Sequence, residues 1–549
     1  MITRVVLIGF SGSGKSTVGR LLEEASGWAL LDMDAEIERR EGTSIPEMFD
    51  SKGEPAFRAL ECEVLLEGLR RERVVISTGG GAMCTEDIWD IVRDDPGVFV
   101  VRFSASADEL LRRLEAHRQE AAPETTTRRP MLDADDQLGR ITGLLAEREP
   151  FYSRAHVTIP VANREPERIA NDVAELVALG NGTPSTVRLD LPHTQSEIVV
   201  GVGTRDTLPA VMADTWPKAR RRWIAADAGM WRAHQPWFDG LRESSALRAD
   251  VHIVNSGESS KSLAGLADLY DWMLEGGVER GDVAIAAGGG VTGDLMGFAA
   301  ATVLRGIGLV QMPTTLLSMV DSSVGGKTGI NHPAGKNLIG AFYQPARVIV
   351  DPTFLSSLPA RELRSGFAEI IKHGMIQAST PGGENGFLLD VLERNAQAFL
   401  ALQEPLTSWI IRQNIELKAS VVREDEKESR LRAILNFGHT IGHGIEAAGY
   451  ALLHGEAVAV GMVAAMTIGV EKGLVSAEHK DRLVGLIDAY GLPVRADVTK
   501  SVVREKMLHD KKKSGGAQQW VLPLRDGGVE IRTDVSEAEI EAGLEAVLG

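Results

Sequence analysis

The sequence predicts an α/β protein with two successive α/β units and a mostly helical region after them. Short apolar runs alternate with longer amphipathic stretches over residues 1–179 of the 549. A segment of Gly, Pro, Ser and Thr at 180–186 interrupts this alternation, which then begins again at 187. Alternating patterns of this kind indicate parallel strands covered by helices, because such strands are buried on both faces.

The first unit, 1–179, has four apolar runs of strand length, each expected to form a buried strand. They lie at 4–10, 74–78, 98–103 and 157–161. Helical periodicity is found at 54–69 and 108–117. A closing helix is expected at 165–179, where Ile169, Val173 and Leu176 share one face.

We interpret 180–186 as a linker and place a second α/β unit at 187–355. Its strands are expected at 198–202, 223–226, 251–254, 283–287, 309–312 and 348–350. Strand signals become rare from about residue 356, so 356–549 are expected to be mostly helical.

The charge and the cysteine count exclude several classes of protein. The chain has 59 Lys and Arg against 77 Asp and Glu, a net charge of −18, which argues against general binding to nucleic acid or to anionic membranes. Two cysteines, Cys62 and Cys84, cannot form a disulfide framework or a thiolate zinc site. No signal peptide and no long apolar run is evident, so a cytoplasmic soluble protein is expected.

A phosphate-loop pattern, GFSGSGKS, occupies residues 9–16 between an apolar run and a helical pattern. Glycines allow backbone N–H groups to face phosphate oxygens, and the amino terminus of the following helix adds partial positive charge. Lys15 can reach the β and γ phosphates, and the Ser16 hydroxyl can bind Mg²⁺. The expected ATP-binding residues of the loop are Gly12, Ser13, Gly14, Lys15, Ser16 and Thr17.

Further polar residues of the first unit suggest an acceptor site. Asp32 and Asp34 follow the apolar pair 30–31, and two carboxylates spaced by two at a strand end point the same way, one toward Mg²⁺ and one toward an acceptor hydroxyl. Arg58 and Arg148 could hold a substrate carboxylate. The polar stretch 117–136 could form a lid that carries Arg129.

These motifs, in this order and spacing, resemble those of shikimate kinases over residues 1–175. They are DMD at 32–34, GEPAFR at 53–58, STGGG at 77–81, RPML at 129–132 and REPFY at 148–152. The resemblance implies a sheet like that of nucleoside monophosphate kinases, and shikimate bound by Asp34, Arg58, Gly80, Gly81 and Arg148. It also implies catalytic roles for Lys15, Asp34 and Arg129, with Mg²⁺ held near Ser16 and Asp32.

The second unit contains a dinucleotide-binding pattern, GGGVTG at 288–293, between an expected strand and a helix. The acidic residue usual about twenty positions downstream is not evident, but Asp227 follows an earlier strand and could bind a ribose. A dense polar block at 313–337 sets glycines beside lysines, which suits a phosphorylated ligand.

Two histidine clusters in the helical region indicate a metal site. His439 and His443 are four residues apart on one helix face, so spacing alone favours them as a ligand pair. His454 follows after a loop, and Glu369 lies on an earlier helix. Two histidines and a carboxylate form a catalytic zinc set that leaves a position open for substrate.

Over about 190–549 these motifs resemble 3-dehydroquinate synthase, whose architecture is a Rossmann-like domain followed by a helical metal-binding domain. The resemblance implies Zn²⁺ or Co²⁺ on Glu369, His439 and His454, and moves His443 to the substrate. It implies NAD contacts from Asp227, Glu258, Lys261, Gly289, Gly290, Asp294, Thr314 and Thr315, with Asp321, Lys327 and Lys336 near both ligands. It implies substrate contacts from Arg305, Asn337, Lys372, Lys418, Arg432, Asn436, His443 and Lys512. Among these, Lys327, Lys372 and His443 are expected to be catalytic, and the family suggests a homodimer through this half.

One segment departs from the family pattern. Arg430 stands where the family usually has glycine, two residues before Arg432, so the loop at 425–432, which carries Arg432, is expected to differ from that of the family.

The expected function is therefore bifunctional: phosphorylation of shikimate with ATP, and NAD- and metal-dependent cyclisation of 3-deoxy-D-arabino-heptulosonate 7-phosphate to 3-dehydroquinate with release of phosphate. Both steps belong to chorismate and aromatic amino acid biosynthesis. One alternative is another sugar-phosphate cyclase or a polyol dehydrogenase in the C-terminal half. A second alternative makes one half a non-catalytic module, against which Lys15, Ser16, Asp34, Arg129 and the three metal-ligand candidates speak.

Overall fold

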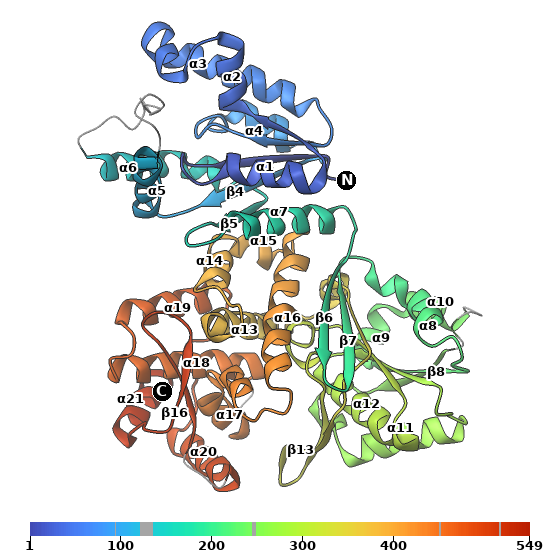
Figure 1. Ribbon diagram of the computed structural model, residues 1–549. Helices are drawn as coiled ribbons and strands as arrows, with labels where there is room; N and C mark the ends of the chain where they lie inside the picture. The colour runs from blue at the N-terminus through green and yellow to red at the C-terminus, as the bar shows by residue number, and fades with distance from the viewer. Residues whose placement is uncertain (94, 121–135, 244–246, 248, 450–451, 515–517) are drawn as a thin grey trace. The chain divides into compact units, whose positions relative to one another are not determined.

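The computed structural model describes all 549 residues except 94, 121–135, 244–246, 248, 450–451 and 515–517 (Figure 1). Two compact units are present. The first comprises Met1–Thr183 with Gln397–Leu406, and the second comprises Pro184–Ala396 with Thr407–Gly549.

The described part of the first unit is built on a five-stranded parallel sheet with the order β2-β3-β1-β4-β5. The strands are β1 (Arg4–Gly9), β2 (Ala29–Asp32), β3 (Val74–Ser77), β4 (Val98–Ser104) and β5 (Val157–Pro160). The central strand β1 is buried from Val5 onward, as expected for a strand covered on both faces. Strand β2 was not among the expected strands, because it is short and half-exposed.

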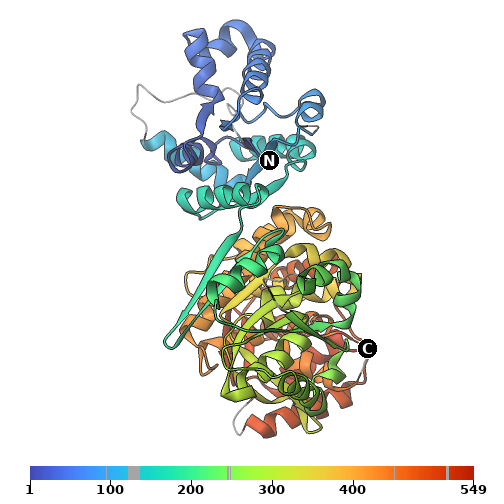
Figure 2. The ribbon, with the colours of Figure 1, turned by 90° about the vertical axis from the view of Figure 1, so that its right-hand side faces the viewer.

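Helices surround this sheet (blue to teal in Figures 1 and 2). They are α1 (Lys15–Ser26), α2 (Met33–Glu41), α3 (Ile45–Leu69), α4 (Glu86–Arg93), α5 (Ala107–Glu120), α6 (Gln137–Tyr152) and α7 (Pro166–Gly180). A capping box between Ser44 and Glu47 begins α3, and Gly53, with a φ of 80°, kinks it. The structure therefore joins the predicted helix at 54–69 to an earlier helical segment.

The second unit contains a mixed seven-stranded sheet among the described residues, with the order β6-β7-β14-β11-β10-β8-β9. The strands are β6 (Ser185–Leu191), β7 (Thr194–Val200), β8 (Arg222–Asp227), β9 (Ala249–Val254), β10 (Val283–Gly288), β11 (Gly308–Pro313) and β14 (Arg347–Val350). Only the β6–β7 pair is antiparallel. Strand β6 begins at Ser185, inside the segment expected to be a linker, and its hairpin with β7 follows the edge of the unit in Figure 2.

The helices of this α/β part are α8 (Leu208–Thr215), α9 (Ala228–Ala233), α10 (Gln235–Glu243), α11 (Leu263–Glu275) and α12 (Gly290–Thr302). A two-stranded hairpin, β12 (Lys327–His332) with β13 (Gly335–Phe342), lies outside the large sheet. This hairpin was not expected, because its strands carry glycine and polar residues instead of an apolar run.

From Ala360 onward the chain is mostly helical (orange to red in Figure 1), and all of this part belongs to the second unit except Gln397–Leu406. The helices are α13 (Ala360–Ile376), α14 (Phe387–Arg394), α15 (Ala396–Leu400), α16 (Leu406–Glu424), α17 (His439–Ala447), α18 (His454–Glu471), α19 (Ala477–Ala489), α20 (Lys500–Ser514) and α21 (Glu537–Val547). Helix α18 is apolar around most of its circumference and packs against α13, α17 and α21, so it forms the centre of this region. A short hairpin of β15 (Trp520–Pro523) and β16 (Val529–Arg532) is the exception to the helical character. Within the described ranges, no helix combines the length and the apolar character that crossing a membrane requires.

Candidate active sites

The phosphate-loop sequence of the first unit connects β1 to α1. Gly14, directly before α1, has a φ of 92°, a left-handed conformation that favours glycine. The Lys15 ammonium donates to the carbonyl oxygens of Gly9 at 2.8 Å and Phe10 at 3.0 Å. The Ser16 hydroxyl lies 3.2 Å from that of Ser77 on β3. A cation and a hydroxyl therefore lie beside a helix amino terminus, where N–H groups favour phosphate.

The glycines at 79–81 are the point where the expected acceptor-site residues meet. A methyl group on Gly80 would lie 2.9 Å from a terminal nitrogen of Arg148, and one on Gly81 would collide with the Arg58 guanidinium. A methyl group on Gly79 would lie 3.1 Å from a carboxylate oxygen of Asp34. Two guanidinium groups and one carboxylate thus border backbone that no side chain covers, an arrangement that suits a small hydroxylated carboxylate.

A buried glutamate that the sequence analysis missed organises this cluster. Arg58, from α3, forms ion pairs with Glu61 and, at 3.0 Å, with Glu54. Glu61 is 1% exposed, and burial raises the pKa of its carboxyl group. Its position three residues after Arg58 on a helix was the available signal.

The two expected aspartates do not share a strand. Strand β2 ends at Asp32, which caps α2 by accepting from the Ala35 N–H at 3.3 Å, whereas Asp34 lies in the first turn of that helix. The inference from strand alternation that both carboxylates point the same way is therefore wrong, because the chain turns into a helix between them. Arg129 lies outside the described residues.

In the second unit, the expected dinucleotide residues gather at the carboxyl ends of adjacent parallel strands. Asp227 ends β8, Gly289 and Gly290 follow β10, and Thr314 follows β11, with its N–H donating to Gly288 at 3.0 Å. A methyl group on Gly289 would lie 3.1 Å from the Thr315 side chain. Open α/β sheets bind nucleotides at this edge.

The turn end of the β12–β13 hairpin contacts residues that follow β9, the strand beside β8. The Lys261 ammonium lies 2.5 Å from both Asp294 and Asn337, and Asn331 donates to Glu258 at 2.7 Å. Asn337 has a φ of 55°, a strained backbone that is common at ligand sites. Arg305, with a φ of 69°, shares this feature.

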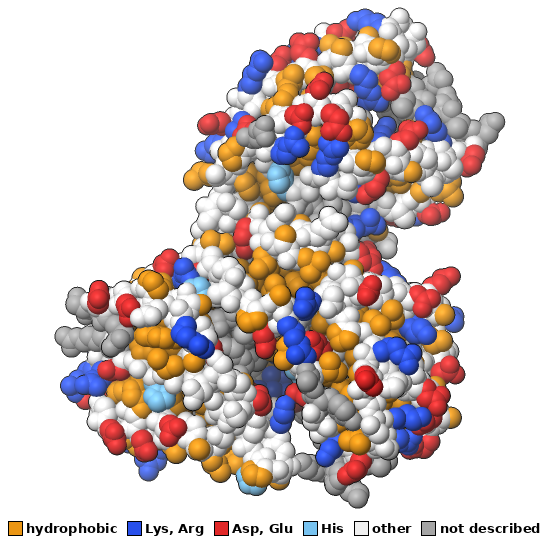
Figure 3. Space-filling view, turned by 180° about the vertical axis from the view of Figure 1, so that it is seen from behind, with side chains coloured by type: hydrophobic (Ala, Val, Ile, Leu, Met, Phe, Trp, Pro, Cys, Tyr) orange, Lys and Arg blue, Asp and Glu red, His pale blue; other side chains and the backbone are white. Residues whose placement is uncertain are grey.

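Expected ligand-binding cations of the second unit are paired with carboxylates. Two of them lie on the β12–β13 hairpin: Lys327 is 2.5 Å from Glu428, and Lys336 is 2.7 Å from Glu446. Lys418 on α16 lies 2.7 Å from Asp321, and burial lowers its pKa to about 8. The sequence analysis missed Glu428 and Glu446. Figure 3 shows a hollow in this unit with Lys and Arg side chains at its border.

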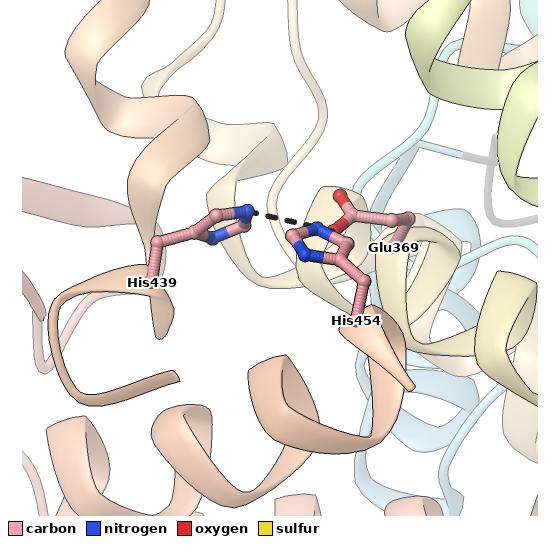
Figure 4. A group of neighbouring side chains, drawn as sticks. All are labelled: Glu369, His439 and His454. Carbon is pink, nitrogen blue, oxygen red and sulfur yellow. Dashed lines mark ion pairs between the residues drawn. The ribbon is translucent and has the colours of Figure 1, made fainter. Parts of the chain in front are cut away.

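Three helices bring Glu369, His439 and His454 together (Figure 4). The Nε2 atoms of His439 and His454 lie 3.6 and 3.4 Å from the same Glu369 carboxylate oxygen. Glu369 is 1% exposed, pairs with Lys372, and neither of its oxygens has a hydrogen-bond partner. Buried carboxylate oxygens facing two imidazole nitrogens fit a divalent metal ion. The pair suggested by spacing, His439 and His443, is not the pair that faces Glu369.

The protonation of this group reflects its burial and its charges. Burial lowers the pKa of His439 well below its usual value. Burial acts in the same direction on His454, but the negative carboxylates of Glu369 and Glu446, which face its two ring nitrogens, outweigh burial and raise the pKa to about 10. Lys372 and the histidines hold the pKa of Glu369 well below its usual value despite burial.

The loop with the unexpected arginine is held by Asp425. Its carboxylate accepts from the N–H groups of Ser429, Arg430 and Arg432 at 2.7 to 3.0 Å. Arg430 has a φ of −153° and a ψ of −88°, a combination outside the main allowed regions, so its backbone is strained at the position where the resemblance expects glycine. The Arg432 side chain is buried and donates to the Gly325 carbonyl oxygen at 3.1 Å.

Two other expected residues, Asn436 and His443, have contacts near the metal-ligand candidates. Asn436 donates to Glu428 at 3.2 Å, and the His443 ring lies 5.0 Å from that of His439, centroid to centroid. Lys512 belongs to α20, and its side chain is outside the described set.

Comparison with known families assigns both parts of the chain. Residues 11–178 match the shikimate kinase family model. Residues 251–365 and 366–513 match the models for the N-terminal and C-terminal parts of 3-dehydroquinate synthase.

Individual relatives agree with this assignment. A 3-dehydroquinate synthase of Prochlorococcus marinus subsp. pastoris is 47% identical over 298 residues, covering 53% of this chain and 80% of the relative. Another 3-dehydroquinate synthase, from Synechococcus sp., is 42% identical over 372 residues, covering 66% of this chain and 98% of the relative.

Two solved structures share the fold of the second unit. 2-Epi-5-epi-valiolone synthase from Streptomyces hygroscopicus, with NAD⁺ and Zn²⁺ bound, has a TM-score of 0.59 at 28% identity, covering 65% of this chain and 97% of that one. A 2-deoxy-scyllo-inosose synthase with carbaglucose-6-phosphate, NAD⁺ and Co²⁺ has a TM-score of 0.56 at 25% identity, covering 66% and 100%. The chain therefore belongs to the 3-dehydroquinate synthase family through its C-terminal part and carries a shikimate kinase domain in the same polypeptide.

Proposed function

We propose that this bifunctional enzyme catalyses two steps of aromatic amino acid biosynthesis. The first unit transfers phosphate from ATP to shikimate. The second converts 3-deoxy-D-arabino-heptulosonate 7-phosphate into 3-dehydroquinate and phosphate. The observation that supports the second activity best is the meeting of Glu369, His439 and His454 in a chain 42% identical to a 3-dehydroquinate synthase along 98% of that relative.

In the second unit, Glu369, His439 and His454 would hold Zn²⁺ or Co²⁺, which as a Lewis acid would acidify a substrate hydroxyl. Bound NAD⁺ would supply reversible hydride transfer and leave the cycle unchanged. Residues at the strand ends, from Asp227 to Thr315, would hold the dinucleotide. The two relatives of known structure bind NAD⁺ together with Zn²⁺ or Co²⁺.

The paired cations of the second unit would bind the phosphate and carboxylate of the substrate. Lys327, Lys336 and Lys418 are each balanced by a carboxylate, so a doubly charged phosphate would replace those pairs without leaving a buried cation unpaired. Buried Arg432 would supply a fixed planar donor. Arg305, Asn337, Lys372, Asn436, His443 and Lys512 complete the proposed substrate and catalytic set.

In the first unit, Arg58, Arg148 and the backbone at 79–81 would hold the shikimate carboxylate and ring, and Asp34 would orient the attacked hydroxyl. Lys15 and Ser16 would bind the ATP phosphates and Mg²⁺, assisted by Asp32 and by Arg129. Phosphoryl transfer depends on positioning and charge stabilisation, which these residues provide.

The test uses the full-length chain and two variants that control for each other. Wild type should form 3-dehydroquinate from the heptulosonate phosphate with no net NADH, and shikimate 3-phosphate from shikimate and ATP. Lys15→Ala should abolish only the kinase reaction, and Glu369→Gln only the cyclisation. NADH accumulation would indicate a polyol dehydrogenase. Turnover of a different sugar phosphate only would indicate another cyclase.

We also propose that the functional domains are 1–179, 187–355 and 356–549, and that the chain forms a homodimer through its C-terminal half. Light scattering on the full-length protein and on residues 187–549 tests this proposal. A dimeric C-terminal fragment is expected, and a monomeric one would contradict it.

A further inference from the structure

One carboxylate, Glu446, joins a metal-ligand candidate to the β12–β13 hairpin. Its Oε2 atom lies 3.2 Å from Nδ1 of His454, and its Oε1 atom lies 2.7 Å from the ammonium group of Lys336. The other ring nitrogen of His454, Nε2, faces Glu369 at 3.4 Å. A continuous polar chain thus connects Lys336 on β13 to the proposed metal site.

The geometry fixes the orientation of the His454 ring. A carboxylate only accepts hydrogen bonds, so Nδ1 carries a proton that faces Glu446, and Nε2 is the nitrogen left to bind a metal ion beside Glu369. His439 is oriented differently, because its Nδ1 lies 3.1 Å from the neutral carbonyl oxygen of Phe437. An imidazole that donates its N–H to a charged carboxylate is a stronger metal ligand than one that donates to a neutral carbonyl oxygen. Of the two histidines, only His454 is linked in this way to a residue outside the metal-binding helices.

We propose that Glu446 is a positioning residue for the metal and that Lys336 regulates the strength of metal binding through it. This proposal rests on the metal site of the proposed function. While Lys336 occupies Oε1, its positive charge draws electron density away from the Glu446–His454 hydrogen bond. When Lys336 turns to an anionic ligand, Glu446 is left to His454 alone, and the metal is bound more tightly. Occupation of the hairpin by cofactor or substrate is therefore coupled to metal affinity, and the coupling is reciprocal.

The experiment measures the Co²⁺ and Zn²⁺ affinities of metal-stripped, full-length protein by visible absorbance and chelator competition. Glu446→Gln keeps the size of the side chain but removes the charge, and should weaken metal binding by about 10- to 100-fold, as loss of such a partner usually does. Lys336→Met should strengthen it several-fold. The double variant should bind like Glu446→Gln alone, because the effect of Lys336 passes through Glu446.

The matched control is Glu539→Gln. Glu539 is another half-buried glutamate paired with a lysine, at 3.1 Å from Lys472, and it lies on α21, away from the histidines. This variant should keep wild-type metal affinity. Circular dichroism and thermal unfolding of the second unit show whether each variant is folded, and the Co²⁺ spectrum reports the ligand geometry directly.

The outcomes separate this inference from the proposed function. If Glu369→Gln leaves metal affinity unchanged, the metal site itself is wrong. If Glu369→Gln weakens binding but Glu446→Gln does not, only the positioning role of Glu446 is overturned. If Lys336→Met strengthens binding equally in both backgrounds, Lys336 acts by direct repulsion of the metal, and the proposed route through Glu446 is wrong.

Discussion

Replacing Asp425 with asparagine should release the loop that carries Arg432. Asp425 is 7% exposed, and its two oxygens accept four hydrogen bonds from three residues of the loop. Burial alone raises the pKa of this carboxyl group, but the N–H groups of Ser429, Arg430 and Arg432 hold it well below its usual range. The carboxylate is therefore charged throughout the neutral range and stabilises the loop fully above the unfolded pKa of about 3.9.

The size of the effect follows from the atoms involved. Oδ2 alone accepts from the N–H groups of Arg430 at 2.7 Å and Arg432 at 3.0 Å. In Asp425→Asn an amide NH₂ group would face these two donors. A hydrogen bond to a charged group contributes about 1.5–3 kcal/mol, so losing two costs about 3–6 kcal/mol. Because the partly exposed loop can relax, we expect a cost at the lower end of this range. A cost of about 3 kcal/mol corresponds to roughly a 100-fold increase in the equilibrium constant for opening of the loop.

Hydrogen exchange followed by mass spectrometry measures this opening in peptides that cover 425–436. Exchange should rise by up to about 100-fold, and the KM of the cyclisation should rise with it because Arg432 is no longer held. Asp534→Asn is the control: Asp534 is an exposed carboxylate paired with Arg532, and its loss should change stability by less than about 0.5 kcal/mol. Unchanged exchange at 425–436 in Asp425→Asn would refute the idea that this carboxylate holds the loop.

Three further predictions concern the two sites and the first unit. Removing the divalent metal with a zinc-selective chelator should abolish cyclisation and leave the Mg²⁺-dependent kinase active. Cyclisation should recover when Zn²⁺ or Co²⁺ is added. Cyclisation that resists the chelator would contradict the metal site. Tyr152→Phe removes a hydroxyl that donates to the Gly80 carbonyl oxygen at 2.6 Å. It should destabilise the first unit by about 1 kcal/mol, measured by thermal inactivation, and raise the KM for shikimate, measured from initial rates. An unchanged KM would show that Gly80 does not contribute to shikimate binding. Burial lowers the pKa of His156, whose Nδ1 accepts from the Val100 N–H at 2.9 Å, so the unfolded state binds more protons and kinase thermal stability should fall as the pH drops below about 6.5. His156→Asn should flatten that profile, and an equally steep fall in this variant would assign the effect to another group.

Local patterns in the sequence predicted most of the first unit. Apolar runs such as 74–78 and 98–103 correspond to β3 and β4, and the loop at 9–16 connects a strand to a helix as its glycines require. Strand β2 was missed, because four residues at a sheet edge are only partly buried and leave no continuous apolar run. The same short strand explains the wrong placement of Asp34, which a helix and not strand alternation positions.

In the second unit, the strand–helix alternation was visible, and the expected strand at 198–202 overlaps β7, but the pairing of β6 with β7 and of β12 with β13 was not predicted. The strands β6 and β7 have one buried and one exposed face, and β12 and β13 are rich in glycine and polar residues. Antiparallel pairs of this kind derive their stability from cross-strand partners, which a single strand does not reveal. Strand β6 consequently begins inside the segment expected to be a linker.

The sequence by itself determined the residue types that each site requires: a phosphate loop with Lys15, glycines after a strand, and a set of histidines with a carboxylate. Only the tertiary structure decided which of them meet. Spacing favoured His439 with His443, whereas the fold turns His439 and His454 toward Glu369 from three helices. It also brought in Glu61, Glu428 and Glu446, whose importance depends on the cations that they face. Periodicity fixes the face on which a side chain lies, but the packing of distant helices fixes the direction of a ring and the partner of a charge.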